Sequence, residues 1–326
     1  MKPVLIHTHF HKRRTGVTRS IENVSSFFYK TYETYFYGNT VKGTKINSFR
    51  LASILFSKRK VVVHCHRNNE IIRMLLLRFF GGKFTLIATR HAETIPSRFT
   101  LKLLKKAEKV ITLTKSMSDN LGIKNTIISH GVDVDLFIPK TETTLKKISQ
   151  QNLILCPGRV RKPKGQVVLL EAAKILRNNS NWALAIIGKV DKPSFLEELK
   201  NITKKHSIEN QVYFIDETME IIPYYQCAKI VVVPSFSEGF SLVAAEAMSC
   251  ECCVIATENV GIHSSLIKHN TNGYLFEAGN YIDLEKLILK LIKKKSFFLG
   301  KEARQEILEN WSAKLEANRL MKLYQE

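Results

Sequence analysis

The chain has 326 residues, of which 44% are hydrophobic and 24% charged, and it is long enough for two domains that each bury a core. It holds no run of about 18 apolar residues, which excludes a membrane-spanning helix. Its first apolar run is too short for a signal peptide and is expected to be a strand. The six cysteines include the cluster Cys250–Cys253, which lies where a helix is expected to lead into a buried strand, so we expect core cysteines in a reducing compartment and no structural zinc.

The positive charge is concentrated in the first half of the chain. The formal net charge is +21, and residues 1–140 hold 25 lysines and arginines against 8 aspartates and glutamates. Residues 141–326 hold 25 against 21. The first half is therefore expected to meet an anionic partner, either nucleic acid, an anionic membrane surface or a phosphorylated acceptor. A merely solvated basic surface is the alternative.

Short apolar segments alternate with helical patterns along the whole chain. In the first half, strands are expected at residues 4–8, 61–65, 84–89, 110–113 and 127–129, and helices at 18–30 and 100–106. A polar stretch rich in threonine and lysine, residues 139–151, is expected to link two domains.

In the second half, strands are expected at residues 153–156, 182–187, 211–214, 230–233 and 253–256, and helices at 164–177, 194–205, 283–294 and 301–325. Strands alternating with helices predict an α/β fold of two doubly wound, parallel-sheet, Rossmann-like domains, residues 1–140 and 141–310, facing a cleft. A helix over about 311–326 is expected to be able to pack back on the first domain. Ligands of such sheets bind at the carboxyl ends of the strands.

The segment 231–261 is the most informative in the chain. Glu238 and Glu246 lie eight residues apart, joined by a Gly-Phe-Ser turn that leads from an apolar strand into a helix. A strand, a tight turn and a helix N-terminus hold an anionic phosphate with backbone N–H groups. A carboxylate at each end of that arrangement predicts a sugar nucleotide, whose hydroxyls need acceptors on both sides of its diphosphate.

A second motif opens the second domain. In LCPGRVRKPKGQ, Gly158 ends a strand, Arg159 follows it, and Lys164 and Gly165 open the next helix. An arginine fork and a lysine point charge on one strand-to-helix loop suit a diphosphate leaving group and can neutralise it without a metal.

Together the two motifs resemble those of the retaining nucleotide-sugar glycosyltransferases of family 4, which have the GT-B fold. That family carries a Gly-Arg…Lys-Gly loop and a Glu-x7-Glu segment written much like SEGFSLVAAEAMSCE. The resemblance spans nearly the whole chain and is strongest over residues 152–279, which include the later turn NGYLFEAGN.

The resemblance implies a role for each matching residue. Glu246 would accept hydrogen bonds from the ribose, and Glu238 would contact hydroxyls of the donor sugar. Arg159 and Lys164 would bind the diphosphate and stabilise the charge that develops as it leaves. Backbone N–H groups would face the sugar or phosphate from Gly239, Phe240 and Ser241. The alternative is structural: Glu238 as a helix N-cap and Glu246 as a salt-bridge partner.

In the first domain, HFHKRRTGVTRSIEN places Gly16 where the family has a glycine-rich, donor-binding loop, although this chain has one glycine where two are usual. The wording KRRxGVT resembles a subgroup that adds mannose to the inner core of bacterial lipopolysaccharide. Arg13 and Arg14 would then bind an acceptor carboxylate or phosphate, unless they are solvent-facing loop cations.

Histidines end two of the predicted strands. By the resemblance, His91 in ATRHAETIPSRFT would contact the donor sugar near the reacting carbon and complete a catalytic set with Glu238, Arg159 and Lys164. In VVVHCHRNNE, His64 and Arg67, beside His66, would line the acceptor side or only cap the sheet. The turn SHGVDVDLF resembles a family turn with His130 replacing asparagine, and is expected to be structural.

These residues predict a metal-independent, retaining hexosyltransferase that needs no cofactor. The resemblance implies front-side attack, with the donor phosphate accepting the proton, and transfer of mannose from GDP-mannose to an anionic, lipid-linked acceptor such as the lipopolysaccharide inner core. Closure of the two domains would exclude water. The basic charge fits peripheral binding to the cytoplasmic face of the inner membrane, with residues 100–109 as a candidate contact.

Three alternatives remain open at this point. A UDP-hexose-dependent transferase for another surface glycan would use the same motifs. A sugar-nucleotide epimerase of the same architecture would release free nucleotide without an acceptor-dependent product. A nucleic-acid-binding protein would fit the charge alone, but no nucleic-acid motif accompanies the basic residues, and no nucleic-acid partner is expected.

Overall fold

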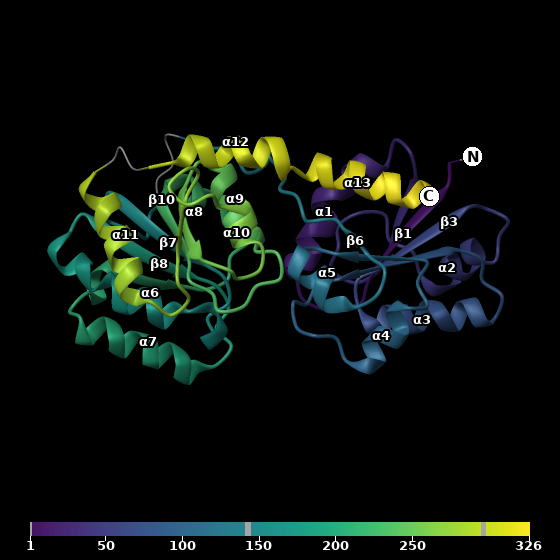
Figure 1. The fold of residues 1–326 in the computed structure, drawn as a ribbon, viewed down its shortest axis with the longest axis horizontal. Helices are drawn as coiled ribbons and strands as arrows, with labels where there is room; N and C mark the ends of the chain where they lie inside the picture. Colours follow the sequence, from purple (N-terminus) through teal and green to yellow (C-terminus); the bar gives the residue numbers. More distant parts are fainter. Residues whose placement is uncertain (1, 141–144, 295–297) are drawn as a thin grey trace. The chain divides into compact units, whose positions relative to one another are not determined.

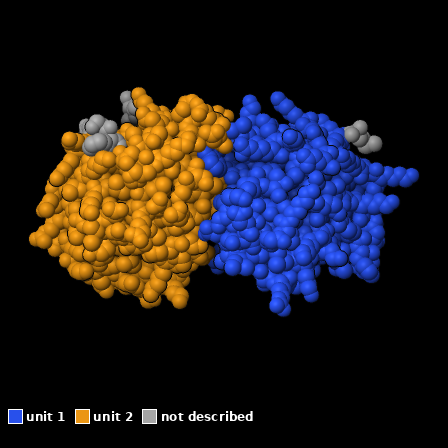
Figure 2. All heavy atoms as spheres, in the orientation of Figure 1, with its two compact units in different colours: residues 1–133, 311–326 blue, residues 134–310 orange. Residues whose placement is uncertain are grey.

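The computed structural model describes residues 2–140, 145–294 and 298–326. The chain forms two compact units, unit 1 from residues 1–133 and 311–326 and unit 2 from residues 134–310 (Figure 2). The first crossing between units therefore falls after Asp133, before the boundary at residue 140 that the sequence suggested. The expected linker, residues 139–151, lies in part outside the described residues.

Unit 1 is built on a parallel sheet of six strands in the order β2-β1-β3-β4-β5-β6 (Figure 1). Its strands are β1 (Val4–His9), β2 (Glu33–Gly38), β3 (Val61–Cys65), β4 (Thr85–Arg90), β5 (Lys109–Thr112) and β6 (Thr126–Ile127). Its helices are α1 (Gly16–Phe28), α2 (Ser48–Leu55), α3 (Asn68–Phe79), α4 (Arg98–Leu104), α5 (Lys115–Leu121) and α13 (Ala313–Gln325).

The last helix of the chain, α13, belongs to unit 1. Its buried side chains Ala317, Leu320 and Leu323 pack in one apolar cluster with Leu5 of β1 and Val62 of β3. The single helix that the sequence suggested over residues 301–325 is two helices, α12 (Gly300–Asn310) in unit 2 and α13 in unit 1.

The start of α13 is held against the loop that follows β6. Val132 N–H donates to Trp311 O at 2.8 Å, and Ala313 N–H donates to Val132 O at 2.7 Å. A Cβ atom on Gly131 would lie 2.4 Å from Ser312 O, so only glycine lets the two backbones approach this closely.

Unit 2 is a second parallel sheet, in the order β12-β11-β10-β7-β8-β9 (Figure 1). Its strands are β7 (Asn152–Pro157), β8 (Trp182–Ile187), β9 (Val212–Ile215), β10 (Ala228–Val233), β11 (Cys253–Thr257) and β12 (Tyr274–Phe276). Its α-helices are α6 (Gln166–Ala172), α7 (Pro193–Lys205), α8 (Ile222–Cys227), α9 (Leu242–Ser249), α10 (His263–Leu266), α11 (Tyr281–Lys293) and α12.

The two parallel sheets covered by helices confirm the expected fold class. The helix expected over residues 164–177 is interrupted, because Gly165 adopts a left-handed backbone with φ of +70°. A short 3₁₀ helix, Lys162–Lys164, precedes it, and α6 and a further 3₁₀ segment, Ala173–Asn178, follow. Among the described residues, no helix combines the length and apolar character needed to cross a membrane.

We predict that Gly131→Ala lowers the free energy of unfolding of unit 1 by about 1–3 kcal/mol, because the added methyl group forces the loop and α13 apart. Gly122→Ala is the control, since a Cβ there meets no atom within 4 Å and the cost is only that of its left-handed backbone, about 1–2 kcal/mol. Denaturant melts measure both variants. Hydrogen exchange in α13 should rise only for Gly131→Ala, and equal exchange in both would contradict this account.

Candidate functional site

Each sheet reverses its strand order at one place, and ligands of doubly wound sheets bind there. In unit 2 the chain runs from β7 through β8 to β9 and then returns to β10 on the other side of β7. No strand separates β7 from β10, so the loops that follow them, residues 158–165 and 234–241, lie side by side. Phe236 N–H donates to Pro163 O at 2.9 Å and joins the two loops.

The close approach of these loops depends on Gly165. A Cβ there would lie 1.8 Å from Pro234 O, and the residue has φ of +70°, so both space and backbone require glycine. The side chain of the adjacent Lys164, on the loop after β7, then reaches Glu238 on the loop after β10. The Lys164-Gly165 pair thus places a cation at the carboxyl end of β10.

An ion pair joins the two sequence motifs. Lys164 Nζ lies 2.6 Å from Glu238 Oε1, and the two side chains are only 17% and 10% exposed. Ser235 Oγ donates to the same carboxylate oxygen at 2.7 Å. Glu238 is not the N-cap of α9, because Ser241 occupies that position with a left-handed backbone. The structure therefore brings together the two residues expected at the sugar and the diphosphate.

Arg159 also lies at this edge, but it has a partner of its own. Its Nε donates to Asp191 Oδ1 at 2.9 Å, and its side chain remains 46% exposed. Gln166 Nε2 donates to Arg159 O at 2.9 Å and holds the loop backbone. Because the Arg159 guanidinium faces solvent, it can exchange this carboxylate for an anionic ligand without exposing a buried charge.

Glu246 differs from the expectation in its accessibility. The residue is fully buried on α9, and Tyr225 on α8 donates its hydroxyl to Glu246 Oε2 at 3.1 Å. A ribose contact would therefore have to reach a carboxylate that is buried and already accepts a hydrogen bond from Tyr225. The side chains of Phe240 and Ser241 are buried as well, so a role for the turn from Gly239 onward rests on backbone groups.

Three polar residues behind Glu238 were not identified from the sequence. Thr257 Oγ1 donates to Ser235 O at 2.7 Å, and His263 Nδ1 lies 2.9 Å from Thr257 O. Burial lowers the pKa of His263, and the nearby Glu238 carboxylate partly opposes that shift. A single histidine in GIHSSL carries no sequence signal for this position.

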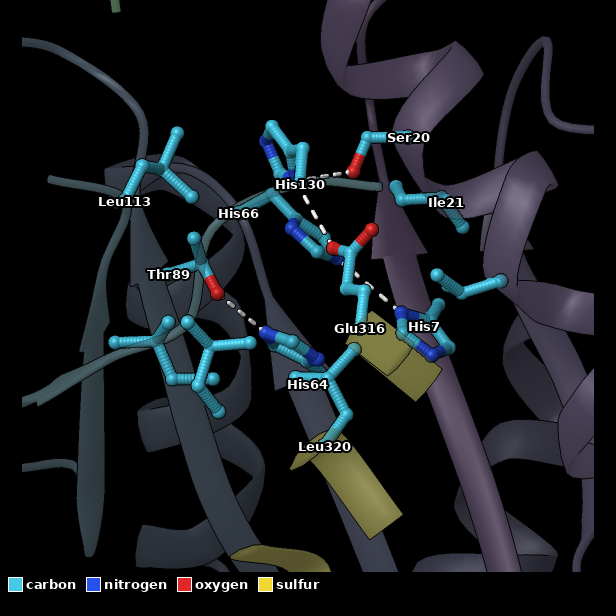
Figure 3. A pocket seen from close by; sticks show the side chains of 13 residues that line it. His7, Ser20, Ile21, His64, His66, Thr89, Leu113, His130, Glu316 and Leu320 are labelled. Carbon is cyan, nitrogen blue, oxygen red and sulfur yellow. Dashed lines mark hydrogen bonds and ion pairs between the residues drawn. The ribbon is translucent and has the colours of Figure 1, made fainter. Parts of the chain in front are cut away.

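The reversal of strand order in unit 1 lies between β1 and β3. The parallel register pairs His7 with His64, and alternation places His9 and His66 two residues further along their strands. His91 follows β4, which is the other neighbour of β3. The sheet therefore gathers histidines at one edge, and Figure 3 shows His7, His64 and His66 around a small cavity that α13 helps to line.

These imidazoles are bonded to one another. His7 Nδ1 lies 3.2 Å from His66 Nε2, and His66 Nδ1 lies 3.1 Å from His91 Nε2. His91 Nδ1 lies 3.3 Å from His130 Nε2, and His130 Nδ1 lies 2.9 Å from Glu316 Oε1. His130, in the turn, and His91, the predicted catalytic histidine, thus belong to one series of hydrogen-bonded rings. The series ends at Glu316 on α13.

Burial keeps these histidines neutral. It lowers the pKa of His7 to about 3, and it holds the pKa values of His64, His66 and His91 well below 6.5, with neighbouring histidines adding to the shift for the last three. Because the pKa values lie below neutrality, an imidazolium is disfavoured at each of these positions.

His64, which was expected to line the acceptor side or only to cap the sheet, is buried in this structure. The residue is 2% exposed, and its ring nitrogens lie 2.7 Å from Tyr324 Oη and 2.7 Å from Thr89 Oγ1. The physical reason is its place on β3, the strand between β1 and β4, under the C-terminal helix. The alternative, that His64 is a structural group of the sheet, describes it better.

His7, His64 and His66 each place a ring nitrogen within 4.8 Å of the other two, which raises the question of a metal site. Their rings are stacked, with His7 and His66 inclined by 12° and His64 and His66 by 29°. Lone pairs lie in the ring planes, and a zinc ion needs them to converge at about 2.0–2.1 Å. Here His7 Nδ1 faces His66 Nε2 at 3.2 Å, and both nitrogens of His64 are bonded to Tyr324 Oη and Thr89 Oγ1, so the geometry favours hydrogen bonds over coordination.

The remaining predicted residues of unit 1 lie on the loops after β1 and β3. Arg13 is exposed, whereas Arg14 forms a two-pronged ion pair with Glu22. Gly16 is the first residue of α1, and Arg67 is the N-cap residue of α3 and is half-buried. Arg13 is therefore the most accessible of the cations expected at the acceptor.

Glu70 is a further buried carboxylate that sequence reasoning missed. It accepts from Thr8 Oγ1 at 2.8 Å, from Phe10 N at 3.1 Å and from His66 N at 2.7 Å. Burial raises the pKa of Glu70, although these hydrogen bonds oppose the shift. The residue ties the loops after β1 and β3 to α3 and so fixes the edge on which the histidines sit.

Comparison with known proteins identifies the class. Residues 138–313 match the family model of glycosyl transferases group 1, so the chain belongs to that family. The chain is 26% identical over 277 residues to the lipopolysaccharide core biosynthesis mannosyltransferase LpcC of Rhizobium leguminosarum bv. viciae, which covers 82% of this chain and 78% of that protein.

A second relative is the lipopolysaccharide core biosynthesis mannosyltransferase LpsB of Rhizobium meliloti, 28% identical over 63% of this chain and 61% of that protein. Among solved structures, Anabaena HepE in complex with UDP and glucose superposes with a TM-score of 0.83 over 99% of both chains, at 14% identity. The protein is a GT-B glycosyltransferase that resembles lipopolysaccharide core mannosyltransferases.

We predict that unit 1 loses stability as the pH falls below about 6.5. The pKa of His7 is lowered on folding, so the unfolded chain binds a proton between pH 6.5 and about 3 that the folded chain does not. The free energy of unfolding then falls by about 1.4 kcal/mol per pH unit for each such histidine. Thermal melts and hydrogen exchange from pH 8 to pH 5 measure the loss.

His7→Phe provides the comparison, because the ring already stacks between Phe28 and Phe36. The variant should show a shallower acid slope, by about the contribution of one histidine. The same slope in both proteins would mean that His7 does not stay neutral in the folded state.

Proposed function

We propose that the protein is a retaining mannosyltransferase that uses GDP-mannose and an anionic, lipid-linked acceptor such as the lipopolysaccharide inner core. The observation that carries this proposal is the Lys164–Glu238 ion pair at the point in unit 2 where strand order reverses. The choice of mannose and of lipopolysaccharide is supported by the names of the two Rhizobium relatives. A UDP-hexose donor and another surface glycan are the alternative.

The ion pair suggests how the donor is received. In the free protein Lys164 and Glu238 satisfy each other, so neither buried charge is left unpaired. A diphosphate can take over Lys164 and recruit the exposed guanidinium of Arg159. Glu238 is then released as an acceptor for sugar hydroxyls, still held by Ser235. Binding the donor therefore switches both residues from structural partners to ligand contacts.

The same groups support a reaction that needs no metal and no cofactor. Two cations face the leaving diphosphate, and their attraction grows as negative charge develops on it. Retention follows if the acceptor hydroxyl attacks on the side from which the diphosphate departs and gives its proton to a phosphate oxygen. In unit 1, Arg13 and Arg67 would attract the anionic acceptor, and His91 would contact the donor sugar.

We predict that GDP-mannose stabilises the protein and UDP-glucose, UDP-galactose and UDP-N-acetylglucosamine do not. A donor present at about 100 times its Kd adds about 2.7 kcal/mol to the free energy of unfolding. Thermal shift with each donor is the measurement, followed by transfer to deacylated lipopolysaccharide. Stabilisation by a UDP-sugar alone would overturn mannose and support the alternative.

In the same assay Lys164→Ala should reduce kcat/KM by about 10²- to 10³-fold, the cost of one donor to a developing anion. Lys162→Ala is the matched control, because Lys162 is an exposed cation two residues earlier on the same loop. Equal effects of both substitutions would show that the loop acts through general charge and not through the pair with Glu238.

We also propose peripheral association with an anionic membrane, but through a different surface from the one expected. In residues 100–109, Leu103 and Leu104 are buried in the core of unit 1, so that segment exposes only its polar face. Four apolar side chains are instead exposed along α3 and its end, namely Ile72 (44%), Leu76 (56%), Phe79 (82%) and Phe80 (66%). We call these four residues the apolar ridge.

The apolar ridge has the features of a membrane contact. Its spacing of four and then three or four residues places it on one helix face. The end of α2 extends it, because Phe56 is 50% exposed and a Cβ on Gly81 would lie 3.8 Å from its ring. Exposed cations lie close by in the chain at Arg73 and Lys83. Exposed aromatic rings flanked by cations bind anionic bilayer surfaces.

We predict that Phe79→Ser with Phe80→Ser weakens binding to vesicles of phosphatidylglycerol and phosphatidylethanolamine by about 10-fold or more, from the apolar area no longer buried. Sedimentation with vesicles is the measurement, and phosphatidylcholine vesicles test the charge requirement. Met219→Ser, at an exposed methionine of unit 2, is the control. Unchanged binding of the double variant would remove the apolar ridge from the proposal.

A further inference from the structure

Four of the imidazoles of unit 1 form a hydrogen-bonded series with a direction. His7, His66, His91 and His130 are joined by successive contacts from Nδ1 of one ring to Nε2 of the next, at 3.2, 3.1 and 3.3 Å. A neutral imidazole has one N–H donor and one acceptor nitrogen. Every ring in such a chain must therefore adopt the same tautomer, and whatever lies at one end decides which tautomer that is.

The end of the chain is a buried carboxylate on α13. Glu316 is 5% exposed, and its two oxygens accept from two different groups. Gly131 N–H donates to Oε2 at 2.7 Å, and His130 Nδ1 lies 2.9 Å from Oε1 (Figure 3). An ionised carboxylate only accepts, so His130 carries its hydrogen on Nδ1. Ser20 Oγ, at 2.7 Å from the same nitrogen, can accept as well.

This anchor sets every ring in turn. His130 has its hydrogen on Nδ1, so its Nε2 accepts from His91 Nδ1–H. His91 Nε2 then accepts from His66 Nδ1–H, and His66 Nε2 accepts from His7 Nδ1–H. The chain ends at His7 Nε2, which is buried and has no partner among the described residues. That assignment leaves a lone pair at the unpartnered end, and a buried N–H is more costly to leave unpaired than an acceptor.

We propose that Glu316 is a positioning residue of the transferase, which holds His91 neutral, in its Nδ1–H tautomer and in one orientation through His130. This inference rests on the proposed function, in which His91 contacts the donor sugar; both ring nitrogens of His91 are bonded to neighbouring histidines, so the carbon edge of the ring makes that contact. Glycosyl transfer builds positive charge on the sugar ring in its transition state. A neutral imidazole backed by a buried carboxylate tolerates that charge, whereas an imidazolium would repel it.

Burial supports the neutral state of His7, His66 and His91. The pKa of His91 lies well below 6.5 because of burial and the neighbouring His130, and that of His66 is lowered in the same way. The ring of His91 stacks on that of His130, with centroids 5.2 Å apart, so both packing and hydrogen bonding fix its orientation.

Glu316→Gln tests the proposal because glutamine cannot replace both oxygens. Its single carbonyl can accept from Gly131 N–H or from His130 Nδ1–H, and its amide group must then donate to the other site. Keeping the Gly131 bond turns an N–H donor towards His130 Nδ1, which has to give up its hydrogen. Each ring along the chain then changes from the Nδ1–H to the Nε2–H tautomer.

The measurement is ¹⁵N NMR of the histidine rings in the full-length protein near pH 7. In the wild-type chain we expect hydrogen on Nδ1 of His91, and in Glu316→Gln we expect it on Nε2. We also expect kcat to fall roughly 10- to 100-fold, as for other groups that orient a functional histidine, while KM for the donor changes little. Finding wild-type His91 in the Nε2–H form overturns the proposal even if the variant does not fold.

Two controls separate positioning from simple support of the helix. Ser312→Ala removes the N-cap of α13 and should lower the melting temperature but leave tautomers and kcat unchanged. Glu326, directly after the end of α13, forms an exposed ion pair with Lys109 of β5. Glu326→Gln removes this pair and should change none of these quantities. If Glu316→Gln lowers kcat no more than Ser312→Ala, the residue is only structural.

The two proposals can fail separately. If the wild-type protein transfers no sugar from any donor, the proposed function fails, but the ring tautomers still decide whether Glu316 orients His91. If transfer is observed and the tautomers do not respond to Glu316→Gln, the positioning role is overturned and the proposed function stands.

Discussion

The return of the chain from β9 to β10 is the constraint on which the proposed donor site depends. In a parallel sheet every strand ends at the same edge, and reversal of strand order leaves two neighbouring loops with nothing between them. Here Gly165 allows its backbone to contact Pro234, and Lys164 reaches Glu238. Burying two charges costs several kcal/mol each unless they are paired. The site is therefore stable before a ligand arrives, and it offers opposite charges to a molecule that carries both phosphates and hydroxyls.

Unit 1 obeys the same rule with different chemistry. Its strand order reverses between β1 and β3, and the side chains gathered there are imidazoles instead of a lysine and a carboxylate. The edge is closed by α13, which arrives from the end of the chain and brings Glu316 and Tyr324 to the histidines. The C-terminal helix thus gives the histidines of unit 1 hydrogen-bond partners, and it also contributes apolar side chains to the core.

Strongly apolar, β-branched runs made the sheets predictable. The interior strands β1, β3, β7 and β8 read as such runs, and each lies within one or two residues of its expected bounds. β2 was not predicted because it is an edge strand, and its sequence ETYFYG alternates polar and aromatic residues. The helix α3 was not predicted because its exposed Leu76 and Phe79 obscure the amphipathic pattern that normally marks a helix.

The candidate site was predictable in unit 2 and less so in unit 1, for a physical reason. Local motifs name Lys164 and Glu238, and sheet topology brings their loops together. A pairing such as that of His130 with Glu316 spans 186 residues and depends on where a separate helix packs. The two alternatives for His64 could not be separated for the same reason, since a strand end looks accessible in the sequence until a distant Tyr324 covers it. Sequence periodicity reports which face of an element is buried, but not what buries it.

The charge of unit 1 can now be divided between surface and interior. Every described lysine and arginine keeps some contact with solvent, whereas the buried titratable groups of this unit include neutral histidines and the carboxyl groups Glu70 and Glu316. Backbone amides of Phe10, His66 and Gly131 bond those two carboxyl groups, and the charge of Arg67 also acts on Glu70. Because no described lysine or arginine of unit 1 is buried, these cations remain at the surface, where they fit the proposed anionic acceptor.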